Sequence, residues 1–491
     1  MLGAFLCCCT IIIIIVFLSK GSRKPKNYPP GPPRWPLIGT FDLSPLSFRK
    51  ANHRVIVAEM VDRYGPTIGT FVGKSPVIYL NDPNMTRRLF NMEVFSGRVS
   101  SSGFQLARSP NGKAKPYGII WTDGELWHHQ RRFSLKSLKD LGFGRTSSES
   151  VIQEEASFLV DYLIKNSSQD FSMESIMNIP VLNVLWRLVA SQRLQMDDPE
   201  AIEIMDSLTS TFGNSTAFRR FLTMLPGSNK LELTGVMKFR AFLDKMFALF
   251  REYIKDHKET IDPSAPRDFI DLYLLEISKN NNADFCEDQL LVIILDLFFA
   301  GAETTSTTLK WAVLFMVLHP ESQNKCRAEI EEVVGARQPS LADMGKLVYC
   351  QATILEIQRM SCTVSSLSHR VIENTHIDGF FFPKDSIVIA NTHYMMKSPQ
   401  LWDDSATFQP ERFIKAGKLQ KDLPQMIPFS VGKRVCMGET LAKQELSVFF
   451  TTMLQRLRFL PPLHNKLPAA EPVRTGLINF PEDYFVHIQQ S

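Results

Sequence analysis

The longest apolar stretch inside the chain predicts a buried central helix. Residues 290–299 are apolar nearly all round, and the one interruption is Asp296. A helix that is apolar on every side belongs in a protein core, and the charge of Asp296 argues against a membrane span. Asp284 would be the N-cap, Glu287 follows three residues later and Pro320 closes the segment, so we expect a helix of about thirty residues.

Other patterns complete a mainly α class with a minor β region. Residues 67–80 form two β-rich runs around Gly73-Lys74-Ser75, which predicts a hairpin, and residues 377–391 predict further strands. Near the C-terminal end, apolar residues recur at helical spacing and predict an amphipathic helix. Its stripe consists of Ala442, Leu446, Phe449, Phe450, Met453 and Leu457.

The N-terminal segment predicts a single membrane anchor helix over residues 1–20. No charged side chain occurs from Leu2 to Ser19, and cations begin at Lys20. A cleaved signal peptide, the alternative, would carry its positive charge before the apolar run. Because cations on the C-terminal side stay in the cytosol, the rest of the chain would face the cytosol. A basic and Pro-rich hinge over residues 21–40 and one large domain over residues 41–491 follow.

Composition excludes several classes of protein. The chain has 491 residues, of which 44% are hydrophobic and 22% charged, and its net charge is +4, so it is globular and gives no indication of nucleic-acid binding. Eight cysteines without a CxxC pair do not form a disulfide framework, and reduced thiols in a cytosol-facing domain fit better.

The middle of the predicted central helix is unusually polar. Its residues 300–305 read Ala-Gly-Ala-Glu-Thr-Thr, where a buried helix should be apolar. A threonine can hydrogen-bond to the carbonyl four residues earlier and glycine weakens the helix, so a kink with a small polar groove is one interpretation. An ordinary surface turn of the helix is the other, and the residues alone favour neither.

Cys436 is the cysteine with the most specific surroundings. Phe429 could shield its sulfur, Gly432 allows a tight turn, Arg434 supplies a cation, and Gly438 lets the following helix approach a flat ligand. These features suit a thiolate that ligates haem iron. A buried, inert cysteine is the commoner alternative, but it does not require these neighbours.

At these residues the sequence resembles the cytochrome P450 family over nearly the whole chain. Residues 429–438 fit the haem-thiolate signature of that family at every defined position. The resemblance implies the cytochrome P450 fold and haem b, with Cys436 as the axial thiolate ligand. It also implies that Gly301, Glu303 and Thr304 form the oxygen-activating segment, which favours the groove over the surface turn.

The resemblance assigns further residues to the cofactor and its support. Glu356 and Arg359 would by spacing alone be a solvated helix pair, but the family pattern implies a buried network with Arg412. His128 and His129 could suggest a metal site, although neighbours on a helix point apart. The expected cofactor-binding residues are Arg98, Trp127, Arg131, His369, Phe429, Arg434 and Gly438.

The implied function is monooxygenation of a lipophilic small molecule (a hormone, lipid or xenobiotic) at the endoplasmic reticulum membrane. The residue sequences of these motifs are similar to those of microsomal animal members of the cytochrome P450 family. Electrons would come from NADPH through NADPH–cytochrome P450 reductase, with cytochrome b5 as a second candidate partner. Alternatives are a haem-thiolate isomerase or dehydratase acting on peroxides, and a non-catalytic haem sensor. A basic patch could steer an acidic reductase and would consist of Arg132, Lys136, Lys139 and Lys433.

The sequence does not name the substrate. The family analogy points to residues 99–120, 212–225, 361–368 and 475–480 as the lining of the pocket. Ser365, Ser366 and Ser368 stand where microsomal relatives often have prolines, so we expect a more polar and less pre-set segment there.

Overall fold

The fold comes from a computed structural model that describes residues 23–36, 38–43, 53–99, 102–113, 115–167, 169–213, 236–472, 474–475 and 477–490. The predicted anchor over residues 1–20 lies outside these residues. The chain divides into two compact units, and both contain residues from the range 41–491. That this range forms one domain stays a prediction. Unit 1 comprises Met1–Val99, Ser365–Ser405 and Pro424–Val435, and unit 2 comprises Ser100–Val364, Ala406–Leu423 and Cys436–Ser491.

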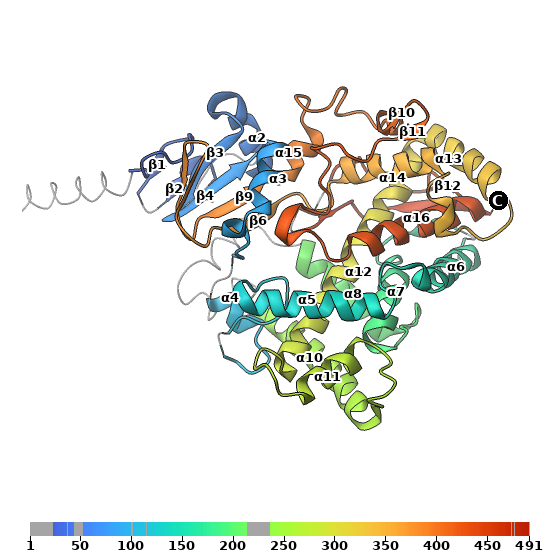
Figure 1. Cartoon of the computed structure of the whole chain (residues 1–491). Helices are drawn as coiled ribbons and strands as arrows, with labels where there is room; N and C mark the ends of the chain where they lie inside the picture. Colours follow the sequence, from blue (N-terminus) through green and yellow to red (C-terminus); the bar gives the residue numbers. More distant parts are fainter. Residues whose placement is uncertain are drawn as a thin grey trace, which may run out of the picture. The chain divides into compact units, whose positions relative to one another are not determined.

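Unit 1 is built on a six-stranded sheet with the order β1-β2-β3-β4-β9-β6. The predicted hairpin is confirmed as β3 (Thr67–Val72) and β4 (Ser75–Leu80), and Ser75 opens β4 instead of belonging to the turn. Figure 1 shows these early strands, in blue, beside orange β9 from much later in the chain. The remaining strands of unit 1 are β1 (Arg34–Trp35), β2 (Gly39–Thr40), β6 (Leu367–Arg370), β7 (Thr375–Ile377), β8 (Phe380–Phe382) and β9 (Ile387–Ala390).

Short helices and tight turns complete unit 1. β9 runs parallel to β4 and β6 runs antiparallel to β9, which confirms the β region predicted for residues 377–391. Two separate apolar clusters form the core of this unit. Its helical elements are η1 (Phe41–Leu43), α2 (His53–Tyr64), α3 (Pro83–Asn91), η2 (Glu93–Phe95), α15 (Thr392–Lys397) and η8 (Gly432–Arg434).

Unit 2 is mainly helical and is organised around α12 (Glu287–Leu318). The helix has 32 residues, close to the predicted length, but Asp284 is not its N-cap, because the helix begins after Cys286. The Asp284 carboxylate is instead hydrogen-bonded to His129 Nδ1 at 2.7 Å, and its carbonyl oxygen accepts from Gln130 Nε2. Because its side chain binds His129, Asp284 does not cap α12. The partner of His129 in this hydrogen bond is a carboxylate and not a metal ion.

Asp296 explains how an apolar helix tolerates a charge. Its carboxylate is paired with the buried Arg108 and also accepts from the backbone N–H groups of Ile119 and Ile120 at 2.7 and 3.0 Å. Within the described residues α12 is the helix long and apolar enough to cross a membrane, and 83% of its most apolar window is buried. α12 is therefore a core helix of unit 2, as predicted.

The other helices of unit 2 pack around α12, and small sheets lie beside them (Figure 1). The predicted class, mainly α with a minor β region, is thus confirmed. The helices are α4 (Ser102–Ala107), α5 (Gly124–Asp140), η3 (Thr146–Ser148), α6 (Glu149–Lys165), α7 (Asn178–Ala190), α8 (Pro199–Gly213), α10 (Val236–Thr260), α11 (Phe269–Ser278), α13 (Pro320–Val333), η6 (Leu341–Asp343), α14 (Val348–Ser361), η7 (Pro410–Phe413) and α16 (Glu439–Arg456). The strands are β5 (Phe171–Ser172), β10 (Ile414–Lys415), β11 (Lys418–Leu419), β12 (Leu457–Leu460), β13 (Arg474–Thr475), β14 (Asn479–Phe480) and β15 (Phe485–Gln490).

The helix predicted after Cys436 is confirmed as α16, with two differences. It is buried on nearly all sides from Glu445 to Leu454, instead of along a single stripe. Leu457, expected at the end of the stripe, opens β12 and pairs with Gln490 of β15. α16 contacts α6, α12 and α13, and this crowding explains why both polar and apolar residues are buried along it.

Candidate active site

Some of the residues predicted for the cofactor belong to unit 1 and the others to unit 2, and each set is described by itself. Cys436 and Gly438 lie where unit 2 begins its last segment, and α5 contributes Trp127 and Arg131 to the same unit. Unit 1 contains the other four residues, which are Arg98, His369, Phe429 and Arg434.

The loop before the cysteine is held against α3 by a glycine. Gly432 has φ +77°, and a Cβ at this position would lie 2.1 Å from the carbonyl oxygen of Phe90. Only glycine allows both the positive φ and this close approach. Two residues later, Arg434 is 5% exposed and its Nε donates to the carbonyl oxygen of Ser96 at 2.7 Å. The guanidinium of Arg434 is therefore fixed in direction before any ligand binds.

His369 lies beside two cationic side chains in unit 1. It is 1% exposed, and its ring is stacked on Phe90 with a centroid separation of 3.7 Å. Burial, and then the charges of Arg98 and Arg434, hold the pKa of His369 well below its ordinary value, so the imidazole is neutral. Neither ring nitrogen makes a hydrogen bond of normal geometry to a described residue.

This arrangement in unit 1 fits a bound carboxylate. The imidazole N–H of His369 would gain an acceptor, and the guanidinium groups of Arg98 and Arg434 would add charged donors to a carboxylate. Arg98 is additionally oriented by the hydrogen bond from its Nη1 to the carbonyl oxygen of Ser368, at 2.9 Å. Haem has two propionates, so the chemistry of these side chains matches the group that the sequence predicted.

Cys436 stands at the N-terminal end of α16 in unit 2. It is exposed, whereas Cys326, Cys350 and Cys362 are buried. The pKa of the Cys436 thiol is raised, chiefly because protein surrounds the sulfur and also because of the charge of Glu439, whereas the backbone N–H groups of Gly438 and Glu439 and the charge of Arg131 lower it. Amide donors at a helix N-terminus stabilise a thiolate, and a bound metal ion would deprotonate the thiol outright. The donor set around Cys436 therefore fits a metal ligand.

Arg131 in α5 is electrostatically coupled to Cys436. Its guanidinium lies 5.7 Å from the ring centroid of Trp127, which is 3% exposed. Burial lowers the pKa of Arg131 and the Cys436 thiolate raises it. Of the residues predicted in unit 2, Arg131 therefore interacts electrostatically with Cys436 and lies beside Trp127.

The predicted network of Glu356, Arg359 and Arg412 is confirmed. Arg359 Nε donates to Glu356 Oε2 at 2.7 Å and Arg359 Nη2 donates to Glu356 Oε1 at 2.8 Å, which makes a bidentate pair within α14. Arg412 Nε, from η7, donates to Glu356 Oε1 at 3.1 Å, and the backbone N–H of Gln409 donates to the same oxygen at 2.9 Å. Because Glu356 and Arg359 are both 0% exposed, this network is a core element and not a solvated helix pair.

The middle of α12 has an accessible strip within a buried helix. Ala300 is exposed, Leu297, Gly301 and Thr304 are half-buried, and most neighbouring residues are fully buried. Their spacing of i, i+3, i+4 and i+7 places them on one face of the helix. Thr304 Oγ1 donates to the carbonyl oxygen of Ala300 at 2.9 Å, which is the predicted bond to the preceding turn. The polar segment thus opens one face while α12 remains helical throughout.

Gly301 has a packing role that sequence reasoning missed. A Cβ at this position would lie 2.7 Å from Leu185 Cδ2, so the glycine allows α12 to pack closely against α7. The predicted weakening of the helix at Gly301 is not needed to explain the residue. The repeated apolar side chains of α7, with Leu185 among them, were the only signal for this contact.

Glu303 is not on the accessible strip. It is 0% exposed, and its Oε1 accepts from Asn178 Nδ2 of α7 at 2.9 Å and from Thr209 Oγ1 of α8 at 2.6 Å. Burial raises the pKa of Glu303 above its ordinary value. Sequence reasoning missed Asn178 and Thr209, although an asparagine in the apolar run of α7 was a usable signal.

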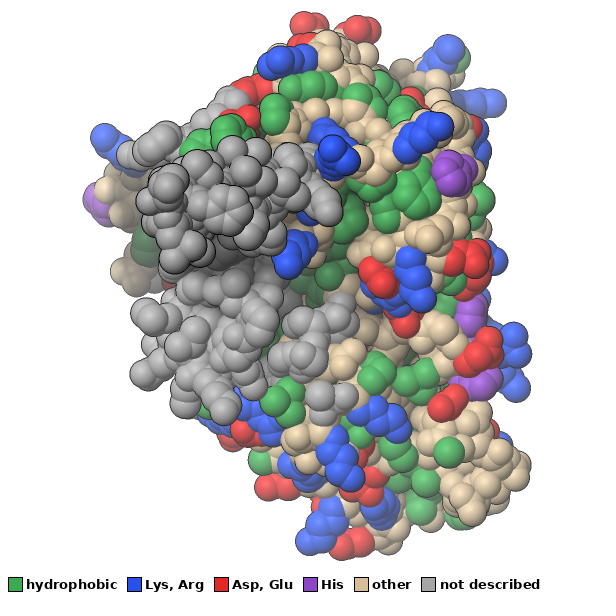
Figure 2. Space-filling view, turned by 90° about the vertical axis from the view of Figure 1, so that its left-hand side faces the viewer, with side chains coloured by type: hydrophobic (Ala, Val, Ile, Leu, Met, Phe, Trp, Pro, Cys, Tyr) green, Lys and Arg blue, Asp and Glu red, His purple; other side chains and the backbone are tan. Residues whose placement is uncertain are grey.

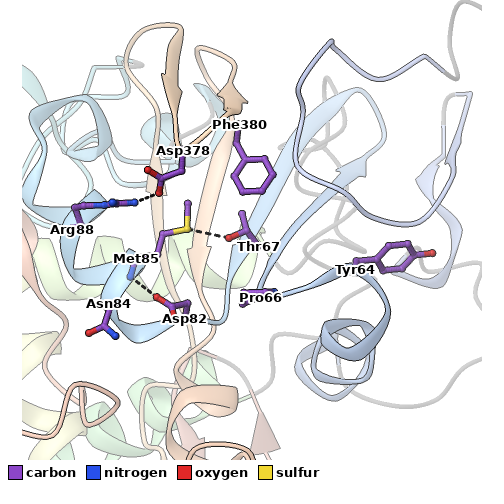
Figure 3. A pocket seen from close by; sticks show the side chains of 9 residues that line it. All are labelled: Tyr64, Pro66, Thr67, Asp82, Asn84, Met85, Arg88, Asp378 and Phe380. Carbon is purple, nitrogen blue, oxygen red and sulfur yellow. Dashed lines mark hydrogen bonds and ion pairs between the residues drawn. The ribbon is translucent and has the colours of Figure 1, made fainter.

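A cavity in unit 1 is lined by side chains that do not include any predicted site residue (Figure 3). Its volume is about 440 Å³, and side chains from β3, α3 and the β7–β8 hairpin line it. Arg88 and Asp378 pair with each other at its edge, and Asp82 caps α3 by accepting from the N–H of Met85. The charged side chains at this cavity therefore already have partners within the protein.

Comparison with known proteins agrees with the geometry. The family model for cytochrome P450 matches residues 29–487. The chain belongs to the cytochrome P450 family. Cytochrome P450 2J3 of Rattus norvegicus is 34% identical over 461 residues, which cover 91% of this chain and 88% of that protein. Cytochrome P450 2J2 of Homo sapiens is 34% identical with the same coverage of both chains, and cytochrome P450 2B2 of Rattus norvegicus is 33% identical over 485 residues, 96% of this chain and 95% of that protein.

Membership establishes the general chemistry of this cytochrome P450. It has the cytochrome P450 fold and is a monooxygenase, and its cofactor is haem with a cysteine thiolate as the axial ligand. The sequence-based predictions of family, enzyme class and cofactor are therefore confirmed.

Proposed function

We propose that this cytochrome P450 inserts one atom of dioxygen into a lipophilic hormone, lipid or xenobiotic, with electrons from NADPH. The observation that carries the proposal is the position of Cys436 at the N-terminus of α16, where two backbone N–H groups and Arg131 act on the sulfur. When bound there, haem supplies dioxygen binding and oxidising power, and the thiolate adds electron density to the iron.

The chain's own residues have separable tasks in this proposal. Arg98, His369 and Arg434 in unit 1, and Trp127 and Arg131 in unit 2, would hold the propionates. Phe429 would shield the sulfur and Gly438 would leave room beside the macrocycle. The accessible strip of α12 would face the reacting substrate, with Thr304 positioning protons and Gly301 leaving space, while Glu303 would supply protons from within the helix bundle.

Electron supply would come from NADPH–cytochrome P450 reductase, with cytochrome b5 as a second donor. Arg132, Lys136 and Lys139 are exposed and recur at i, i+4 and i+7 on one face of α5. Lys433, the fourth residue of the expected patch, belongs to unit 1 and lies 3.8 Å from Glu93 Oε2. A docking face of this kind predicts that the rate of reduction by the reductase falls as salt increases.

The membrane and substrate parts of the proposal rest on the sequence. Residues 1–20 would anchor the chain in the endoplasmic reticulum membrane, and the catalytic part would face the cytosol.

On the face shown in Figure 2, Lys and Arg are interspersed with Asp and Glu, which supports the expectation that nucleic acid is not a partner. Ser365, of the serine segment 365–368, is 1% exposed.

The first experiment is the carbon monoxide difference spectrum of the dithionite-reduced, membrane-expressed protein. We expect the strongly red-shifted Soret band of a thiolate-bound haem, and its loss in Cys436→Ala. Cys286→Ser is the matched control, because it changes a cysteine but keeps a good N-cap for α12. A band that persists in Cys436→Ala would contradict the ligand assignment. Product formation without NADPH and reductase would favour the isomerase or dehydratase instead.

A further inference from the structure

A second group of buried polar side chains lies between α7, α8 and α12, and it is called here the Glu303 cluster. It consists of Asn178, Thr209, Glu303 and Lys310. Asn178 and Glu303 are 0% exposed, Lys310 is 5% exposed and Thr209 is 7% exposed. Burying four polar side chains in a helical core costs free energy unless they serve one another or a function.

The hydrogen bonds of Glu303 are concentrated on one carboxyl oxygen. Asn178 and Thr209 both donate to Oε1, at 2.9 and 2.6 Å. Glu303 Oε2 and Asn178 Oδ1 are both buried and have no hydrogen-bond partner among the described residues. A carboxylate with a bare oxygen is costly in a core, but a neutral acid has an O–H on Oε2 that needs an acceptor such as an amide oxygen. Both unpartnered atoms are oxygens, which accept and cannot donate, so a proton on Oε2 would supply a donor that the cluster lacks.

Lys310 is the cation that acts on this carboxyl group. It follows Glu303 by seven residues, so the two side chains lie on the same face of α12. Side chains of a helix tilt toward its N-terminus, which directs the ammonium of Lys310 back toward Glu303. Burial lowers the pKa of Lys310 and Glu303 raises it, while Lys310 lowers the pKa of Glu303 against the larger effect of burial.

Other charged groups around the cluster are acidic and exposed. Asp206 on α8 acts on both Glu303 and Lys310, and Glu174 and Asp483 act on Lys310 alone. Each of these three raises the pKa of Lys310, and Asp206 also raises that of Glu303. Since they lie toward solvent, they mark the side from which a proton can enter the cluster.

We propose that Asn178, Thr209 and Lys310 are positioning residues for Glu303, whose neutral carboxyl group stores a proton in the core of unit 2. Asn178 and Thr209 fix its orientation, and Lys310 sets how readily it gives the proton up. The inference rests on the proposed function, in which Glu303 supplies protons during oxygen activation.

The proton balance is simple. The O–H bond of Glu303 breaks, a water molecule that enters the cluster accepts the proton, and a carboxylate remains. The charge of Lys310 stabilises that carboxylate until a proton from solvent, arriving on the side of Asp206, restores the acid. The carboxyl group is therefore unchanged after each turnover.

The test is an infrared pH titration of the holoenzyme. The C=O stretching band of a protonated carboxylic acid is assigned to Glu303 by its loss in Glu303→Gln. We expect this band at neutral pH, and we expect Lys310→Met to move its titration midpoint upward by roughly one pH unit, because an adjacent positive charge favours the carboxylate. Lys310→Arg keeps the charge and should keep the midpoint. Lys245→Met, which removes an exposed lysine of α10, is the matched control and should leave the titration midpoint unchanged.

The second readout concerns orientation. Asn178→Leu and Thr209→Val each remove a donor to Oε1, so the band should move to higher frequency, as for a less hydrogen-bonded carbonyl. More NADPH should also be consumed per product in these variants. Absence of the band in the wild-type holoenzyme, or an unchanged midpoint in Lys310→Met, would overturn the inference. If the band titrates as expected but no product requires NADPH and reductase, the proposed function fails while the charge coupling stands.

Discussion

Two buried glutamates of unit 2, Glu356 and Glu303, show how the same residue type at the same burial acquires different chemistry. Both are 0% exposed. Glu356 meets two guanidinium groups and a backbone N–H, so both of its oxygens face strong donors that are mostly charged. Glu303 meets an amide and a hydroxyl on one oxygen only. The identity of the donors, more than burial, separates a fixed ion pair from a carboxyl group that can exchange a proton.

The difference follows from where each residue lies. Glu356 is in α14, three residues before Arg359, and η7 brings Arg412 to the same carboxylate. Arg359 Nη2 also donates to the carbonyl oxygen of Thr407 at 3.3 Å, which ties α14 to the segment before η7. Glu303 lies in the central helix, where its hydrogen-bond donors from α7 and α8 are uncharged. Glu356 therefore joins α14 to η7 through charged groups, whereas Glu303 is held against α7 and α8 by uncharged donors.

The largest effect is expected when the ion pair of Glu356 is broken. Glu356→Gln removes the buried carboxylate that Arg359 and Arg412 share and should lower the free energy of unfolding by about 3–5 kcal/mol. Glu303→Gln keeps an acceptor for Asn178 and Thr209 and should cost about 1 kcal/mol. Urea unfolding of both holoenzyme variants measures the contrast. Equal losses would remove the distinction between the two glutamates.

A smaller effect is expected where α12 packs against α7. Gly301→Ala places a Cβ 2.7 Å from Leu185 Cδ2, so overpacking should cost about 1–3 kcal/mol and separate Glu303 from Asn178. The carbonyl band of Glu303 should shift, while the haem content should stay the same. Gly345→Ala, where nothing lies within 4 Å of an added Cβ, is the control. Leu185→Ala should restore the band in the double variant, and failure to do so would show that the contact is not the cause.

The sequence predicted most of what local chemistry determines. The hairpin around Gly73, the central helix and the helix after Cys436 follow from periodicity and turn residues. The network of Glu356 was implied by the family pattern and not by spacing, because i,i+3 pairs are usually solvated. Asn178 and Thr209 could not be paired with Glu303 in advance, since long-range contacts between helices depend on packing. Asp284 was misassigned because a good capping residue can bind elsewhere, here to His129.

His257 is an intermediate case, a buried titratable group between a charged and a neutral partner. Its Nε2 is hydrogen-bonded to Asp268 at 2.8 Å and its Nδ1 to the carbonyl oxygen of Tyr253 at 2.6 Å. Burial lowers the pKa of His257, but Asp268 and the other partners together raise it by more than burial lowers it, so the net shift is upward. The stabilisation is fully present below the unfolded pKa of about 6.5 and is lost as pH rises through the higher folded pKa.

We therefore expect the melting temperature of the wild type to fall as pH rises above about 6.5, in part through His257. The contribution should be about 1 kcal/mol, and His257→Asn should remove that part of the slope. His464→Asn, on an exposed loop, is the control. A steeper slope in His257→Asn than in the wild type would mean that the sign is wrong.

The smallest effect is expected at Asp343, which has a charged partner as Glu356 has, but an exposed one. Arg337 is 48% exposed, and its hydrogen bonds, together with those of Ser340, lower the pKa of Asp343 to about 2 against the opposing effect of burial. This stability is present above the unfolded pKa of about 3.8 and is lost as pH falls toward 2.

Because water screens the guanidinium of Arg337, Arg337→Ala should lower the free energy of unfolding less than any of the changes above, and added salt should reduce that loss further. Glu356→Gln should keep its full cost in the same salt series, because both partners of that pair are dry. Unfolding of the two variants at low and high ionic strength measures this difference. A cost at Arg337 that salt does not change would mean that donor geometry, and not exposure of the cation, controls how strongly a carboxylate of this protein is held.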